Sequence, residues 1–109
     1  MATKTSINQT VTLVVNKFVA HLGTQGIPVQ QAIIYGSWAK GNAKKDSDID
    51  LCIVSENFGR DNIGELQFLL KQTRAIDNRL EPVPFTSEEL ANPYSTLASE
   101  IRTHGIRIV

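Results

Sequence analysis

Cysteine is almost absent from this sequence, since Cys52 is the single one among 109 residues. A lone cysteine excludes an intramolecular disulfide. Because Cys52 lies inside an apolar run, we expect it to be a small buried hydrophobe rather than a nucleophile. His21 and His104 have no Cys or His partner at metal-ligand spacing, so surface or helix-capping roles are expected for both.

A net charge is also missing, because eleven basic residues balance eleven acidic ones. Proteins that hold a polynucleotide through its phosphates usually carry a basic excess, so a long polynucleotide partner is not expected. The sequence contains no apolar stretch of signal-peptide or membrane-span length, which favours a cytoplasmic location without a membrane partner. The hydrophobic content of 41% is enough for a packed core, and the length predicts one domain over residues 1–109.

The spacing of apolar residues predicts an α/β (α+β) domain with a small mixed β-sheet and flanking helices. Helices are expected over 7–22, 61–78, 87–90 and from about 97 to the stop at Gly105, and strands over 32–35, 48–54, 79–85 and 106–109. Two prolines make 79–85 an edge or terminating strand. In the helix at 61–78 the residues expected to face inward are Ile63, Leu66, Leu69, Leu70 and Ile76.

Asp48 and Asp50 are the first candidates for chemistry. On a strand, residues i and i+2 point to the same face, roughly 6–7 Å apart. Two carboxylates at that spacing suit hard divalent cations such as Mg²⁺. Asp-x-Asp alone is a weak signal, because it is common at solvated strand ends. Gly36-Ser37 after a strand could hold a phosphate, but by itself the pair indicates an ordinary strand-to-helix turn.

The combination is far more specific. Gly36-Ser37-Trp38-Ala39-Lys40-Gly41 is followed, after a polar stretch, by Ser47-Asp48-Ile49-Asp50-Leu51. This pattern resembles the nucleotidyltransferase motif of the DNA polymerase β superfamily, whose small members read Gly-Ser-x-Ala-x-Gly and then Ser-Asp-x-Asp-Leu. The length of the chain is similar to that of the minimal nucleotidyltransferases (MNT), so the resemblance implies a nucleotidyltransferase fold.

The resemblance also implies site roles. The nucleotide would be held by Gly36, Ser37 and Ser47, and two Mg²⁺ ions by Asp48 and Asp50. Among the nearby lysines Lys40, Lys44 and Lys45, which are otherwise solvated loop charges, Lys40 is the preferred phosphate contact because it lies inside the motif. The superfamily uses a third carboxylate on a neighbouring strand, for which Glu81 is the candidate catalytic and metal-binding residue. Glu81 has an alternative role as a solvated charge on an edge strand. Trp38 could stack on a base, although half-buried packing is favoured.

Three functions remain open at this point. The first is an enzyme that moves a nucleoside monophosphate, AMP from ATP, onto a hydroxyl acceptor. The second follows from the resemblance of minimal nucleotidyltransferases to antitoxins, whose partner is a small helical protein of the HEPN type. On that interpretation the domain acts by contact alone or by adenylylating its partner. The third is a nucleotide-binding domain without turnover. The sequence leaves a homo-oligomer open.

Overall fold

Four strands form one mixed β-sheet in the computed structural model, which describes residues 8–109. The order across the sheet is β3-β2-β1-β4, with β1 at Gln31–Tyr35, β2 at Ile49–Val54, β3 at Leu80–Phe85 and β4 at Ile106–Arg107. β2 runs antiparallel to β1 and parallel to β3, and β4 runs antiparallel to β1. The predicted mixed sheet is therefore confirmed, and the proline-containing β3 lies at its edge as expected.

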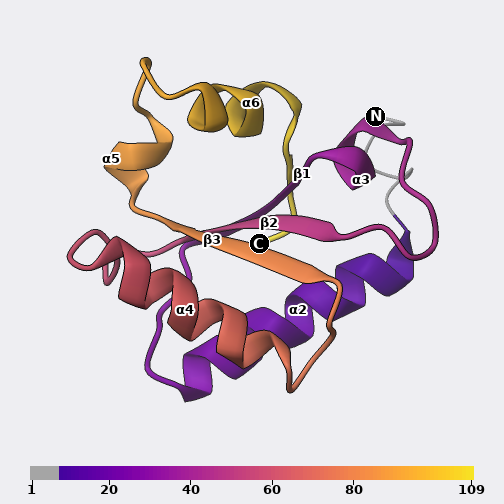
Figure 1. Ribbon diagram of the computed structural model, residues 1–109, viewed down its shortest axis with the longest axis horizontal. Helices are drawn as coiled ribbons and strands as arrows, with labels where there is room; N and C mark the ends of the chain where they lie inside the picture. The colour runs from indigo at the N-terminus through magenta and orange to yellow at the C-terminus, as the bar shows by residue number, and fades with distance from the viewer. Residues whose placement is uncertain (1–7) are drawn as a thin grey trace.

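The helices cover the two faces of the sheet unequally (Figure 1). Helices α2 (Gln9–Thr24) and α4 (Asn62–Thr73) lie on one face, and the shorter α5 (Ser87–Leu90) and α6 (Thr96–His104) lie on the other. The single turn α3 (Ser37–Lys40) follows β1 directly. No helix within residues 8–109 combines the length and apolar character needed to cross a membrane.

The sequence of β2 is a nearly continuous apolar run because helices cover both faces of the strand. Its odd-numbered residues pack with α2 and α4, and its even-numbered residues from Cys52 onward pack with Ile101 of α6. A strand covered on both faces buries every side chain, which removes the alternation of a half-exposed strand. Cys52 is fully buried, as expected, and burial raises the pKa of its thiol to about 12. Asp50 shares the α6 face of β2 with Cys52 and Val54.

Several predicted boundaries were wrong by a few residues. β2 begins at Ile49 instead of 48, so Asp48 lies just before the strand. Helix α4 ends at Thr73 instead of 78, because residues after it form turns that lead to β3. β4 covers only two residues of the predicted 106–109. The predicted start of the first helix at residue 7 lies outside the described residues, within which α2 begins at Gln9.

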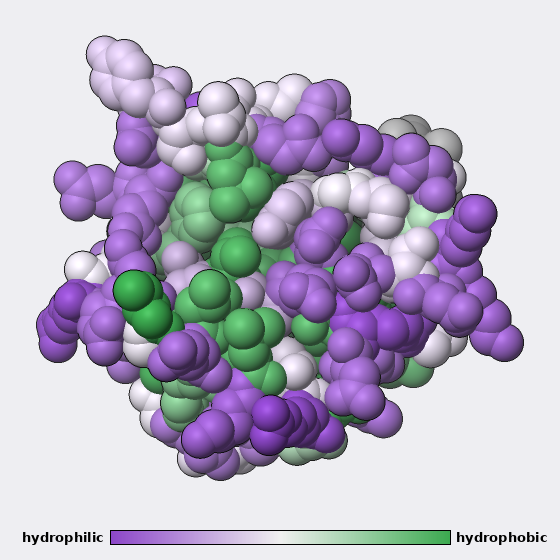
Figure 2. Space-filling view, in the orientation of Figure 1, coloured by the Kyte–Doolittle hydropathy of each residue, from purple (hydrophilic) through white to green (hydrophobic). Residues whose placement is uncertain are grey.

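The predicted inner face of the helix at 61–78 was also wrong in part. Leu69 is fully buried, but Ile63, Leu66 and Leu70 have side chains that are 73%, 36% and 39% exposed. The buried side is formed by Phe68, Leu69 and Thr73, which follow the same helical spacing on a different stripe. Figure 2 shows apolar atoms gathered on the face that α4 and β3 present to the viewer. Apolar residues on two stripes of α4 made the periodicity ambiguous.

Candidate functional site

Gly36 ends β1 in a conformation that only glycine adopts readily, with φ of 73° and ψ of −146°. The backbone there passes directly against Asp50, so a Cβ on Gly36 would overlap the Asp50 carboxylate. Glycine is thus required at position 36 both by backbone conformation and by the neighbouring acid. The turn that follows, α3, has no side-chain cap on its first residues, among them the half-buried Ser37.

Sheet register pairs two of the three predicted carboxylates. Asp50 lies opposite Glu81 of β3 in the parallel pair, and neighbours in register point to the same face of a sheet. Asp48 precedes Asp50 by two residues and lies just before β2. Partial burial raises the pKa of Asp50, and the negative charge of Asp48 raises it further. The two aspartates are therefore close enough to repel each other.

This arrangement fits divalent cations by the chemistry of its donors. Asp50 and Glu81 share one sheet face, and a cation between Asp48 and Asp50 would relieve the repulsion of these two aspartates. Within residues 8–109, no three His, Cys, Asp or Glu side chains are gathered closely enough to hold a metal by themselves. Mg²⁺ is commonly held by one or two carboxylates together with substrate phosphates, so a complete protein cage is not required.

Two further side chains belong to this region and were missed from the sequence. Tyr35, which was expected to be core, lies in register with Asp50 on β1. Burial raises the pKa of Tyr35 to about 12, and the charges of Asp50, Glu81 and Glu100 contribute. The position of Tyr35 immediately before Gly36 could have indicated from the sequence that it lies near the site. No sequence feature indicates this for Glu100 of α6, because its contact with the site arises only from tertiary packing.

Lys40 forms an ion pair with Glu100. Its Nζ lies 3.0 Å from Oε2 of Glu100, and both side chains are partly exposed. The predicted role of Lys40 toward phosphate would require this ion pair to open or to share its ammonium. Lys40 and Glu100 thus link α3 with α6 beside the carboxylates.

Hydrogen bonds within the loop, and from Trp38 and Arg79, hold the loop between α3 and β2. The Ser47 hydroxyl accepts a hydrogen bond from the Lys44 backbone N–H at 2.8 Å. The indole N–H of Trp38 donates to the Ser47 carbonyl at 3.1 Å, and Trp38 packs half-buried on the core, as favoured from sequence. Arg79 Nη1 donates to the Lys45 carbonyl at 3.0 Å. Ser47 therefore shapes the approach to Asp48, and its predicted contact with a nucleotide stays a prediction.

Comparison with known families gives one match. Residues 15–101 match the family described as nucleotidyltransferase domain. The matched segment contains α3, the loop to β2 and all three carboxylates of the site. No curated protein sequence matches the chain significantly.

Solved structures share the fold at low sequence identity. A toxin–antitoxin structure with AMP-PNP matches with a TM-score of 0.63 and 24% identity, over 86% of this chain and 71% of that one. A chain from the complex of an MNT antitoxin with the tri-AMPylated HEPN toxin of Shewanella oneidensis matches with a TM-score of 0.55 and 22% identity, over 89% of this chain and 70% of that one. A Sulfolobus solfataricus protein assigned as a nucleotidyltransferase matches with a TM-score of 0.59 and 15% identity, over 97% and 82%.

Proposed function

The chain belongs to the nucleotidyltransferase domain family, and from this premise we propose that it transfers AMP from ATP to a hydroxyl group on a small helical partner of the HEPN type. One observation carries the proposal. The strained backbone of Gly36 lies against the carboxylate of Asp50, which is in register with Glu81 on the neighbouring strand and two residues after Asp48. A glycine turn beside acidic side chains suits the recognition of phosphate and metal.

The chemistry assigned to this site is a single displacement. The acceptor oxygen bonds to the α-phosphorus of ATP, the bond from that phosphorus to the bridging oxygen breaks, and pyrophosphate leaves. The hydroxyl proton passes to a carboxylate of the cluster, for which Glu81 is exposed and accessible. Gly36 and Ser37 would hold the triphosphate, and Asp48 and Asp50 would hold Mg²⁺. Bound Mg²⁺ would neutralise charge on the phosphate oxygens during transfer.

The likeness to the toxin–antitoxin structures supports the choice of partner. One such structure contains AMP-PNP, and another contains an AMPylated HEPN toxin with an MNT antitoxin. Their identity to this chain is below 25%, so they support the fold, and the acceptor is our proposal. The balanced charge of the chain also favours a protein over a polynucleotide.

The decisive experiment is co-expression with a HEPN-type protein, followed by intact-mass measurement of that protein. We expect a mass gain of one or more AMP units that needs ATP and Mg²⁺ and disappears with Asp48→Asn. Glu81→Gln should reduce the gain strongly. Full gain in Glu81→Gln would show that Glu81 is a solvated edge charge and not the third ligand.

A binding function without turnover is the second candidate. It is favoured by the same toxin–antitoxin neighbours, because a complex can neutralise a toxin by contact alone. Stable binding of the partner with unchanged mass, under ATP and Mg²⁺, would support this candidate and contradict the enzymatic proposal for that acceptor.

A further inference from the structure

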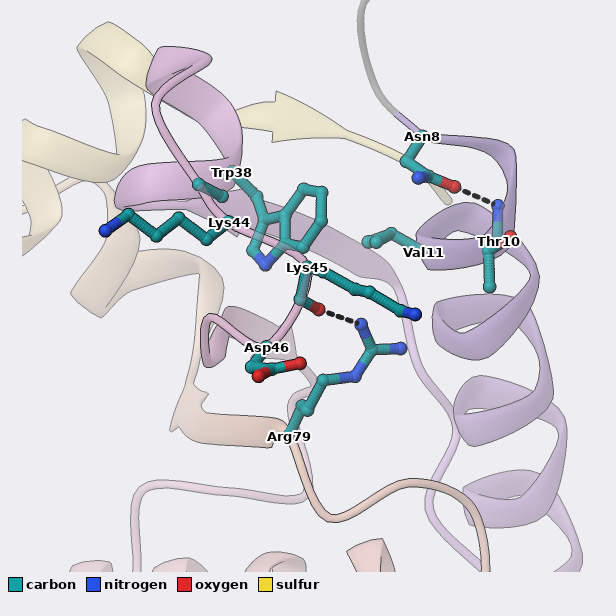
Figure 3. Close-up of a pocket in the computed structure, with 9 residues that line it drawn as sticks. Asn8, Thr10, Val11, Trp38, Lys44, Lys45, Asp46 and Arg79 are labelled. Atoms are coloured by element: carbon teal, nitrogen blue, oxygen red, sulfur yellow. Dashed lines mark hydrogen bonds between the residues drawn. The ribbon is translucent and has the colours of Figure 1, made fainter.

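A cavity lies beside the loop that leads to Asp48, and the carboxylates of the proposed active site do not line it. Its volume is about 620 Å³, and it opens between the first turn of α2, Trp38, the loop at 43–46 and Arg79 (Figure 3). None of Asp48, Asp50 and Glu81 lines it. The volume lies in the range of small-ligand sites, roughly 300–1,000 Å³.

One wall of this cavity is aromatic and apolar. Trp38 and Val11 both line it, and both pack on the core that α2 forms with the sheet. The polar edge of the indole is already satisfied by its hydrogen bond to the Ser47 carbonyl. That bond also fixes the ring, since it ties Trp38 to the far end of the loop. A fixed, half-buried indole is a surface on which a flat aromatic ring can stack.

The opposite side of the cavity carries positive charge. Figure 3 shows the Lys45 side chain and the Arg79 guanidinium extending toward α2, whereas Lys44 extends to the other side of Trp38. Neither Lys44 nor Lys45 has an ion-pair partner within residues 8–109. Their ammonium groups are therefore able to receive an anion.

Hydrogen bonds fix the position of Arg79 but occupy only some of its N–H donors. Its Nε and Nη2 donate to the two oxygens of Asp77 at 3.1 and 3.0 Å, and its Nη1 donates to the Lys45 carbonyl at 3.0 Å. A guanidinium has five N–H groups, so two of them still lack a partner in these bonds. Asp46 is the acid in the cavity wall. Of the lining cations that extend toward α2, Arg79 is paired with Asp77, whereas Lys45 has no ion-pair partner among residues 8–109. Lys45 therefore supplies the unpaired positive charge of the cavity.

We propose that this cavity binds a mononucleotide, with the base against Trp38 and the phosphate at Lys45 and Arg79. An aromatic wall opposite a positively charged one matches a ligand with a flat ring at one end and an anion at the other. The site is separate from the one assigned to ATP and Mg²⁺, and it does not depend on transfer activity. A ligand there would touch the loop at 43–46, which continues into Asp48.

The test uses Trp38 as the reporter, because it is the single tryptophan of the chain. AMP is titrated into the full chain in EDTA, with excitation at the red edge of tryptophan absorption, and calorimetry is run in parallel. We expect saturable binding of AMP, and weaker binding of adenosine and of inorganic phosphate. Lys45→Ala should weaken AMP binding about tenfold, the effect of losing one charged hydrogen bond. Lys17→Ala, an exposed lysine on α2 outside the cavity, is the matched control and should bind like wild type.

The outcomes separate this site from the proposed active site. Ser37→Ala should leave AMP binding in EDTA unchanged, and loss of binding in that variant would place the ligand at the Gly36-Ser37 turn of the proposed active site and overturn the proposal. Equal affinity in Lys45→Ala and wild type would overturn it too, as would the absence of calorimetric binding at millimolar AMP. None of these results bears on AMP transfer to a partner, which is measured separately by mass.

Discussion

At the scale of single residues, Asp50 is the point where the demands of folding and chemistry conflict. Asp50 lies on β2, whose other residues are fully buried. Its position in the strand is on the α6 face of the sheet, opposite the main core. Burial and the charge of Asp48 raise the pKa of its carboxyl above the ordinary value of 3.8. A folded-state pKa above the unfolded value means that ionising Asp50 costs stability. Such a cost is common where a protein keeps a charged group ready for a ligand.

The variant Asp50→Asn should therefore be inactive and more stable. Wild-type stability owed to protonated Asp50 is present below pH 3.8 and is lost as the pH rises through the raised folded pKa. The neutral amide removes that loss, so we expect Tm at neutral pH to rise by a few degrees at most, because solvent screens a half-exposed site. AMP transfer should fall by about a hundredfold or more. Thermal denaturation across pH and intact-mass assays give the two readouts.

A matched control is available in Asp46→Asn, an exposed acid two residues before Asp48. It should retain transfer and should lack the pH-dependent gain in Tm. A fall in Tm for Asp50→Asn at neutral pH would contradict the argument, because it would mean that the ionised carboxylate makes a net stabilising contact.

At the scale of elements, the sequence predicted the strands and their local turns well. The run before Gly36 and the run after Asp48 became β1 and β2, because burial on both faces leaves a continuous apolar signature. The close contact between Gly36 and Asp50 could be expected only from the resemblance, because the sequence alone does not determine the register between β1 and β2. Two stripes of apolar residues on α4 gave the wrong inner face, because periodicity does not say which stripe meets the core.

Contacts between elements distant in the chain were beyond prediction from sequence. The ion pair of Lys40 with Glu100 depends on α6 packing through Ile101 onto the sheet face that holds Asp50. No spacing or motif relates positions 40 and 100. Its consequence is that α6 places a carboxylate beside the lysine expected to meet phosphate.

We predict that Glu100→Gln strengthens binding of ATP with Mg²⁺. The change frees Lys40 and removes a negative charge near the triphosphate, and an exposed ion pair of this kind is worth about two- to fivefold in affinity. In a Lys40→Ala background the gain from Glu100→Gln should shrink, because there is no ammonium left to release. Calorimetric titration of ATP with Mg²⁺ into the four proteins of this cycle measures the coupling.

Glu88→Gln, an exposed acid on α5 that is not paired with Lys40, is the control and should bind ATP like wild type. Weaker binding in Glu100→Gln would show that Glu100 positions Lys40 for phosphate instead of competing for it. An undiminished gain in the Lys40→Ala background would mean that the charge of Glu100 acts alone.

At the scale of the whole molecule, the surface is uneven even though its net charge is zero. Three of the six exposed large hydrophobic side chains within residues 8–109 lie on α4, namely Ile63, Leu66 and Leu70. They occur at i, i+3 and i+7, so they share one face of the helix. A neighbouring groove of about 340 Å³ is lined by Leu66 and by Val83, Pro84 and Phe85 of β3. Gathered apolar surface of this kind is typical of a protein-binding region.

On the proposed function, the HEPN-type partner needs an interface of about 800 Å² on this small domain. We predict that the α4 face, Ile63, Leu66 and Leu70, is part of that interface, and that Leu66→Asp weakens the complex by about tenfold or more, because it places a charge in a desolvated apolar contact. Leu66 is partly exposed, so the fold should tolerate the change. Leu13→Asp on α2, where the leucine is 59% exposed, is the matched control. Calorimetry with the purified partner gives the affinities, and ATP titration with Mg²⁺ checks that the active site is intact. Equal weakening by both substitutions would indicate a general loss of folding, and unchanged affinity in Leu66→Asp would place the partner on another face.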